Sequence, residues 1–193
     1  MRVAAASLLS LAVLAGLGVR SAPGSPALAH EVLDVGDSLS VGTGPYLRRS
    51  LHGYRINAVH DVGLHAYDAA AIVSERRASL PPVIVVSAGT NDDPRIVSTF
   101  IRSISRVLDA AGPKRCVVWP SIVRPPAVGA SYHGLNSALT RAARQHRNLV
   151  VIDWVRMVRE HHWWLAADGV HVSSAGYRAR AAAIASAVVD RCS

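Results

Sequence analysis

The sequence is poor in the features that mark several other classes of protein. Its 193 residues include only two cysteines, two methionines and one phenylalanine. It has no internal repeat, low-complexity tract or linker-like segment, which argues against a repeat protein and against several domains. It also has no aromatic–basic motif, and its basic residues do not form one tract, so we expect no nucleic-acid partner.

The N-terminal segment is apolar but too short for a typical membrane span. Arg2 precedes an apolar run over 3–19 that two glycines interrupt, and a small-x-small cleavage site ends at Ala29. A membrane-spanning helix needs about 20 apolar residues, and no cysteine lies near the cleavage site to carry a lipid. The pattern predicts a secretory signal peptide over 1–29, with a single membrane anchor as the alternative. Residues 30–193 would then form a single domain of a secreted, extracellular protein.

The chain is basic, with 21 Lys and Arg against 13 Asp and Glu and a formal net charge of +8. The arginines are scattered singly or in pairs, such as Arg48-Arg49 and Arg76-Arg77, in segments with a helical pattern. Solvated helix faces account for this distribution. Attraction to an anionic cell-wall or membrane surface is the alternative.

Five short apolar runs predict a parallel sheet covered by helices. The runs are continuous rather than alternating, which indicates strands buried on both faces. Helical patterns lie between them, and this alternation implies a three-layer α/β/α domain with right-handed crossovers. The predicted strands are 32–35, 54–62, 83–86, 116–119 and 149–152, and the predicted helices are 44–51, 67–80, 94–111, 135–146 and 175–189.

The third of these helices has the clearest pattern, because its apolar residues follow the three-and-four spacing of an inward-facing stripe. We expect Asp93 as its N-cap, Pro94 as its first residue and Gly112-Pro113 as its stop. Asp34 is unusual, since it places a carboxylate inside the first predicted strand. A buried acid needs a partner, so we expect either an edge position or a paired arginine.

Three polar clusters follow predicted strands or close the last loop: Gly-Asp-Ser at 36–38, Gly-Thr-Asn-Asp at 89–92 and Asp-Gly-Val-His at 168–171. The carboxyl ends of parallel strands meet at one edge of a sheet, and ligands bind there. We therefore expect these clusters, although distant in sequence, to lie close together.

The side chains of these clusters suit acyl transfer. A serine hydroxyl is a weak nucleophile unless a base takes its proton and a third group orients that base. Ser38 supplies the hydroxyl, His171 the imidazole and Asp168 the carboxylate. Acyl transfer also needs donors aimed at the developing oxyanion; the candidates are the backbone N–H groups of Ser38 and Gly63 and the side-chain amide of Asn91.

These residues resemble the four sequence blocks of the SGNH hydrolases, also called GDSL-type esterases and lipases. The blocks are Gly-Asp-Ser-Leu at 36–39, Gly63, Gly-x-Asn-Asp at 89–92 and Asp-x-x-His at 168–171, in that order. The resemblance implies that Ser38 is the nucleophile, that His171 is base and then acid, and that Asp168 orients it. It implies oxyanion donors at Ser38, Gly63 and Asn91, and a five-stranded parallel sheet in the order 2-1-3-4-5. Ser38 would begin the helix after the first strand.

Other residues suggest substrate contacts or a metal site. The segment 161–164 reads His-His-Trp-Trp, but no further ligand cluster accompanies its histidines, so we expect no metal. We expect Trp163 and Trp164 to pack beneath the loop that carries His171, with one at the rim against substrate. The long connection 124–134 leaves the fourth strand at the edge where loops set specificity, which makes Tyr132 and His133 candidate substrate contacts. The remaining histidines are interpreted as surface or local hydrogen-bonding residues.

The two cysteines fit one disulfide. An even number of cysteines in an exported protein favours a disulfide over a metal site. In the expected fold, Cys116 begins the fourth strand and Cys192 ends the last helix. Both would lie at the edge of the sheet away from the catalytic residues, because strands and crossover helices run in opposite directions.

The sequence therefore predicts a secreted, monomeric serine esterase that hydrolyses carboxylic esters through an acyl-enzyme and needs no cofactor. Its substrate would be an acyl lipid, an acylated glycan or a small ester. One alternative is an acyltransferase or deacetylase acting on cell-surface glycans, and another is a non-catalytic binding module that kept the fold.

Overall fold

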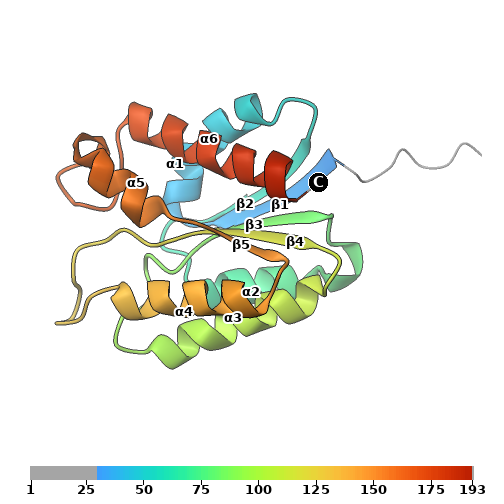
Figure 1. The fold of residues 1–193 in the computed structure, drawn as a ribbon, viewed down its shortest axis with the longest axis horizontal. Coiled ribbons are helices and arrows are strands. Elements are labelled where there is room, and N and C mark those ends of the chain that lie inside the picture. The colour runs from blue at the N-terminus through green and yellow to red at the C-terminus, as the bar shows by residue number, and fades with distance from the viewer. Residues whose placement is uncertain (1–29, 193) are drawn as a thin grey trace, which may run out of the picture.

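The computed structural model describes residues 30–192 of the chain as a three-layer α/β/α domain (Figure 1). All neighbouring strands are parallel, and the sheet order is β2-β1-β3-β4-β5, which confirms the predicted fold. The segment 1–29, with the predicted signal peptide, lies outside the described residues.

The strands are β1 (Glu31–Gly36), β2 (Arg55–His60), β3 (Val83–Ser87), β4 (Cys116–Pro120) and β5 (Leu149–Ile152). The helices are α1 (Ser38–Ser50), α2 (Ala66–Glu75), α3 (Val97–Ala111), α4 (His133–Gln145), α5 (Trp154–Glu160) and α6 (Ser174–Arg191), with 3-10 turns η2 (Arg77–Ser79) and η3 (His162–Trp164).

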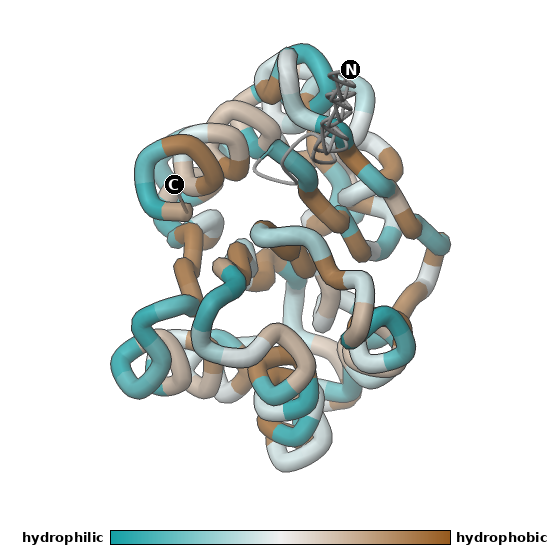
Figure 2. Tube along the Cα trace, turned by 90° about the vertical axis from the view of Figure 1, so that its right-hand side faces the viewer, coloured by the Kyte–Doolittle hydropathy of each residue, from teal (hydrophilic) through white to brown (hydrophobic). Residues whose placement is uncertain are grey.

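The sheet separates two hydrophobic cores because successive side chains of a strand point to opposite faces. On β1, Leu33 and Val35 pack toward α2, α3 and α4, whereas Val32 packs toward α1 and α6. Figure 1 shows these two helical layers on opposite sides of the sheet. In Figure 2 the hydrophobic segments concentrate toward the middle of the molecule and the hydrophilic segments toward its outside. Within residues 30–192, every helix falls short of the length or the apolar character that a membrane span requires.

Several predicted boundaries were wrong, for local reasons. The helix predicted over 44–51 from its sequence pattern begins at Ser38, the start that the family resemblance implied, and carries Pro45 inside it. The helix predicted from Pro94 begins at Val97, because the Asp93 carboxylate accepts a hydrogen bond from the backbone N–H of Arg95 and closes a separate turn. The strand β2 is an edge strand with no buried residue, so it is not buried on both faces. The seven-residue helix α5 was not predicted.

The hydrogen-bond partner of Asp34 is a histidine rather than an arginine, and the expected edge position was wrong. Strand β1 lies between β2 and β3, so Asp34 is not at an edge. Its Oδ2 is 2.8 Å from Nε2 of His60 on the neighbouring strand. The carboxylate is therefore satisfied across the β1–β2 pair, and His60 is a local hydrogen-bonding residue, as expected.

A disulfide joins Cys116 at the start of β4 to Cys192 after α6, as predicted. The bridge fastens the last helix to the sheet at the end opposite the carboxyl ends of the strands.

Replacing both cysteines by alanine is expected to lower the free energy of unfolding by about 4 kcal/mol. The bond restricts the unfolded chain between residues separated by 76 positions, and chain-entropy estimates give about this value for a loop of that size. Urea denaturation of the oxidised protein and of the double variant measures the difference. An unchanged midpoint would contradict the expectation.

Candidate active site

The nucleophile candidate Ser38 is held at the point where β1 turns into α1. Gly36 ends the strand, and a Cβ at this position would lie 2.8 Å from the carbonyl oxygen of Ser87, so the turn requires glycine. Asp37 is the N-cap of α1, and its Oδ1 accepts a hydrogen bond from the backbone N–H of Leu39 at 2.9 Å. Ser38 is the first residue of the helix, where free backbone N–H groups favour negative charge.

A continuous hydrogen-bonded line joins Ser38 to the last loop of the domain. The Ser38 Oγ lies 2.8 Å from Nε2 of His171, 133 positions away in sequence. The Nδ1 of the same ring lies 2.6 Å from Oδ2 of Asp168. With the proton on Nδ1, the ring donates to Asp168 and leaves Nε2 free to accept the serine proton. This is the arrangement of groups that activates a serine.

Asp168 is fixed as a carboxylate by donors from its own loop. The hydrogen bond from the His171 ring and those from the backbone N–H groups of Val170 and His171 lower the pKa of the Asp168 carboxyl to about 2. The carboxylate is half-exposed, so hydrogen bonding rather than burial sets its charge. Asp168 is therefore ionised at neutral pH.

The substitution Asp168→Asn is expected to reduce kcat by about 10² to 10⁴-fold. The amide can no longer impose the Nδ1–H tautomer or stabilise the imidazolium that forms when His171 takes a proton. Because the pKa of Asp168 is about 2, wild-type activity is also expected to show no loss from Asp168 protonation above about pH 4. Steady-state kinetics over a pH series test both statements, and an Asp168→Asn variant with wild-type kcat would contradict the assigned role.

The predicted oxyanion donors line the same cavity as Ser38 and His171, which has a volume of about 420 Å³. Gly63 follows β2 with a positive φ of 86°, a conformation that favours glycine. Asn91 follows β3, and its Nδ2 donates to the carbonyl oxygen of Leu64 at 3.2 Å. This contact uses one of the two amide protons, so a second proton is available to a ligand.

Comparisons with known proteins agree on the fold. The sequence is 27% identical over 150 residues to the O-acetyltransferase OatA of Staphylococcus aureus, a match covering 75% of this chain and 23% of that protein. The catalytic domain of OatA from Streptococcus pneumoniae superposes with a TM-score of 0.70 at 20% identity, over 86% of this chain and 96% of that one. A lipolytic protein of the G-D-S-L family from Veillonella parvula superposes with a TM-score of 0.64 at 17% identity, over 82% and 97%.

The chain has the fold of the SGNH hydrolases. The predicted resemblance is thereby confirmed for the architecture. No family model matches the sequence. The chain spans about a quarter of the length of the curated relatives it matches.

Within this SGNH fold, the connection after β4 contributes to the site in part. Arg124, Pro125, Pro126 and Ala127 line the cavity beside Ser38, so the start of the loop lies where a substrate would bind.

Tyr132, in the same connection, was wrongly predicted to contact substrate. It is only 4% exposed, and its hydroxyl donates to the carbonyl oxygen of Asp92 at 3.1 Å. The ring therefore supports the chain that follows β3. The sequence around Tyr132 does not indicate whether this side chain is buried or exposed.

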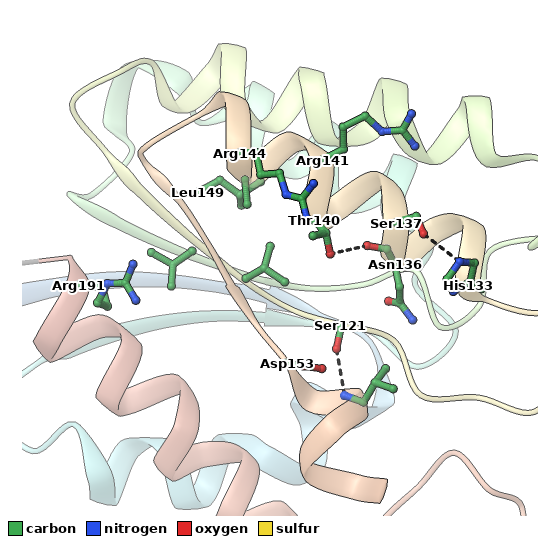
Figure 3. Close-up of a pocket in the computed structure, with 14 residues that line it drawn as sticks. Ser121, His133, Asn136, Ser137, Thr140, Arg141, Arg144, Leu149, Asp153 and Arg191 are labelled. Atoms are coloured by element: carbon green, nitrogen blue, oxygen red, sulfur yellow. Dashed lines mark hydrogen bonds between the residues drawn. The ribbon is translucent and has the colours of Figure 1, made fainter.

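His133 lies away from the cavity that holds Ser38. It lines a second cavity, of about 810 Å³, together with Arg144 of α4 and Arg191 of α6 (Figure 3). The prediction that it contacts substrate at Ser38 is therefore wrong. Its ring interacts with Ser137 one turn along the helix.

The two tryptophans before the loop that carries His171 differ in exposure. Trp164 stacks on the rings of Trp154 and His161, and its carbonyl oxygen accepts a hydrogen bond from Ser173, so it packs against the loop region as predicted. Trp163 is 62% exposed. Neither lines the cavity of Ser38, and contact of Trp163 with a substrate stays a prediction.

A buried charge network beneath Ser38 was not predicted. Arg180 of α6 is 3% exposed, and its guanidinium donates to the Ser87 hydroxyl at 2.7 Å and lies over the Trp154 ring. Burial lowers the pKa of Arg180 to about 10, while the carboxylates of Asp37 and Asp34 oppose the change. Burial likewise raises the pKa of Asp37, and Arg180 opposes that shift. The buried carboxylate at the N-cap of α1 is therefore partly offset by the positive charge of Arg180.

Proposed function

We propose that this protein is a serine-dependent acyl-transferring enzyme that acts on carboxylic esters through an acyl-enzyme at Ser38. The observation that carries the proposal is the unbroken line of contacts from Ser38 Oγ to His171 Nε2 at 2.8 Å and from His171 Nδ1 to Asp168 at 2.6 Å. The similarity to O-acetyltransferases and G-D-S-L proteins supports the same reaction class.

The reaction would begin with attack of Ser38 Oγ on the ester carbonyl carbon, while the hydroxyl proton passes to His171 Nε2. The tetrahedral oxyanion would be held by the backbone N–H groups of Ser38 and Gly63 and by the Asn91 amide. The bond to the alcohol oxygen then breaks, and His171 returns its proton to the leaving alkoxide. A second hydroxyl compound, deprotonated by His171, then attacks the acyl carbon. The bond between this carbon and Ser38 Oγ breaks, and His171 returns the proton to Oγ.

The identity of this second hydroxyl compound separates the two enzymatic proposals. Water gives an esterase, and a glycan hydroxyl gives an acyltransferase, because the same acyl-enzyme serves both. The relatives include a protein named as an O-acetyltransferase of peptidoglycan and a carbohydrate esterase of Clostridium thermocellum. We propose an acylated glycan as the substrate class and hydrolysis as the default outcome.

The test is a panel of 4-nitrophenyl esters of increasing acyl length, run with and without a soluble glycan acceptor. Release of nitrophenol with free acid as the product supports the esterase. Acylated glycan, measured by mass spectrometry, supports the transferase. Absence of nitrophenol in every arm would contradict both and favour the non-catalytic binding module.

We also propose that the enzyme works outside the cytoplasm. The leader-like sequence over 1–29 and the Cys116–Cys192 disulfide support this, because disulfides persist in oxidising compartments. Fractionation of cells that express the full chain tests the location; a reduced, uncleaved protein in the cytoplasm would contradict it.

A further inference from the structure

Arg124 brings a positive charge into the cavity of Ser38. It follows β4 and lines the cavity together with Asn91 and His171. One terminal nitrogen, Nη1, donates to the carbonyl oxygen of Thr90 at 2.6 Å and to Oδ1 of Asn91 at 3.3 Å. These two contacts hold the guanidinium in place without neutralising it, because both acceptors are uncharged.

The charge of Arg124 is uncompensated within residues 30–192. None of the carboxylates in this part of the chain forms an ion pair with Arg124, and its Nε and second terminal nitrogen make no hydrogen bond there. The cavity lining contains one other charged side chain besides the catalytic histidine, Asp168. That carboxylate is already engaged by the His171 ring and by two backbone N–H groups.

We propose that Arg124 forms an anion subsite, and that the preferred ester carries a carboxylate within reach of its guanidinium. This inference rests on the proposed function of the same site. A guanidinium presents paired donors that match the two oxygens of a carboxylate, and it is only weakly hydrated, so a partly enclosed arginine binds such a group well. A single cation in the lining matches a singly charged carboxylate better than a phosphate dianion.

A positioning role for Arg124 would have a different signature. By donating to Asn91 Oδ1, Arg124 also helps to orient the amide that is expected to bind the oxyanion. Loss of that contact lowers the rate for every ester, whatever its charge. The charge of the substrate therefore separates an anion subsite from a purely positioning residue.

The experiment compares two pairs of esters that differ in charge. In the first pair, mono-4-nitrophenyl adipate carries a carboxylate on the acyl side and 4-nitrophenyl hexanoate is its neutral partner. In the second pair, 4-acetoxybenzoate carries a carboxylate on the alcohol side and its methyl ester is the neutral partner. The variants are Arg124→Met, which removes the charge, and Arg124→Lys, which keeps it. Arg141→Met, at the second cavity on α4, is the matched control, and thermal unfolding verifies the fold of each.

With Arg124→Met, we expect kcat/KM for the anionic ester of at least one pair to fall about 10- to 100-fold more than for its neutral partner, as for a lost hydrogen-bonded charge pair. Arg124→Lys should retain most of this preference, and Arg141→Met should leave both esters unchanged. Added NaCl should weaken the anionic reaction selectively. The pair that responds shows which side of the ester faces Arg124. Equal losses for charged and neutral esters in both pairs, or no loss, would overturn the subsite.

A binding measurement keeps the subsite testable apart from catalysis. Calorimetry with 4-acetamidobenzoate, an unreactive analogue, and with its methyl ester reports affinity without turnover. We expect the carboxylate to bind wild type at least about 10-fold more tightly than Arg124→Met, and equal affinities would overturn the subsite. Wild type that binds the analogue but releases no product from any ester would contradict the proposed function alone.

Discussion

Replacing Ser38 by alanine is expected to lower kcat for ester turnover by about four to six orders of magnitude. The hydroxyl is the only described group that approaches His171 Nε2 at hydrogen-bond distance, so the variant has no oxygen in position to form the acyl-enzyme. Pre-steady-state mixing with a 4-nitrophenyl ester should show a burst of nitrophenol in wild type, where acylation is faster than deacylation, and none in the variant.

The fold should tolerate the change, because Ser38 is half-buried and its hydroxyl hydrogen-bonds to no residue but His171 within residues 30–192. Ser137→Ala, at the second cavity, is the matched control and should keep wild-type turnover. Near-wild-type turnover by Ser38→Ala, measured on a sample with an unchanged melting temperature, would place the chemistry elsewhere.

Replacing Arg180 by methionine is expected to lower the free energy of unfolding by about 3 to 5 kcal/mol at neutral pH, the cost found when a buried charge is left uncompensated. The guanidinium lies in the core between Ser87 and the Trp154 ring, and its charge offsets those of Asp37 and Asp34. One oxygen of the buried Asp37 carboxylate already has no hydrogen-bond partner among the described residues, so the variant also loses the nearby positive charge that offsets it.

The loss in Arg180→Met should depend on pH with a defined sign. Burial already raises the pKa of Asp37, and Arg180 counters this shift, so removing Arg180 raises the pKa of the folded state further. A carboxyl whose pKa is higher in the folded than in the unfolded state binds its proton more tightly when folded. Stability is then lost as the pH rises above the unfolded value of about 4. The deficit should therefore shrink on acidification.

Chemical denaturation at several pH values, with two further variants, tests this account. Adding Asp37→Asn to Arg180→Met removes the uncompensated charge and should recover part of the loss at neutral pH. Arg178→Met, exposed on the same helix beside Tyr46, should cost less than about 1 kcal/mol. A deficit for Arg180→Met that grows on acidification would contradict the buried-charge explanation.

The sequence predicted the sheet and the reactive groups because both depend on local patterns. Buried strands in a parallel sheet appear as continuous apolar runs; β3, β4 and β5 have that form, and β1 has it apart from Asp34. Ser38, His171 and Asp168 stand in short polar clusters after strands or in the last loop. The topology of a parallel sheet brings such clusters together at one edge, so the predicted fold was enough to predict that these side chains lie close together.

The residues that sequence reasoning missed depend on contacts between distant side chains. Arg180 lies four residues before Ile184, on the buried face of α6. Taken alone, an arginine at this spacing suggests that the buried face of the helix has been assigned wrongly. Together with the unexplained Asp34 in a strand, it could have suggested a buried charge network. Tyr132 and Arg124 lie eight residues apart in one connection, and only the packing of that loop decides which of them faces the cavity.

The central claim is that Ser38 is the nucleophile and that His171 activates it. The most direct test is reaction with a fluorophosphonate, followed by intact-mass analysis and peptide mapping. We predict one adduct per chain, on the Ser38 oxygen, with labelling strongly slowed in His171→Ala. Absence of an adduct in folded wild type, an adduct on another residue, or labelling at the wild-type rate in His171→Ala would contradict the account.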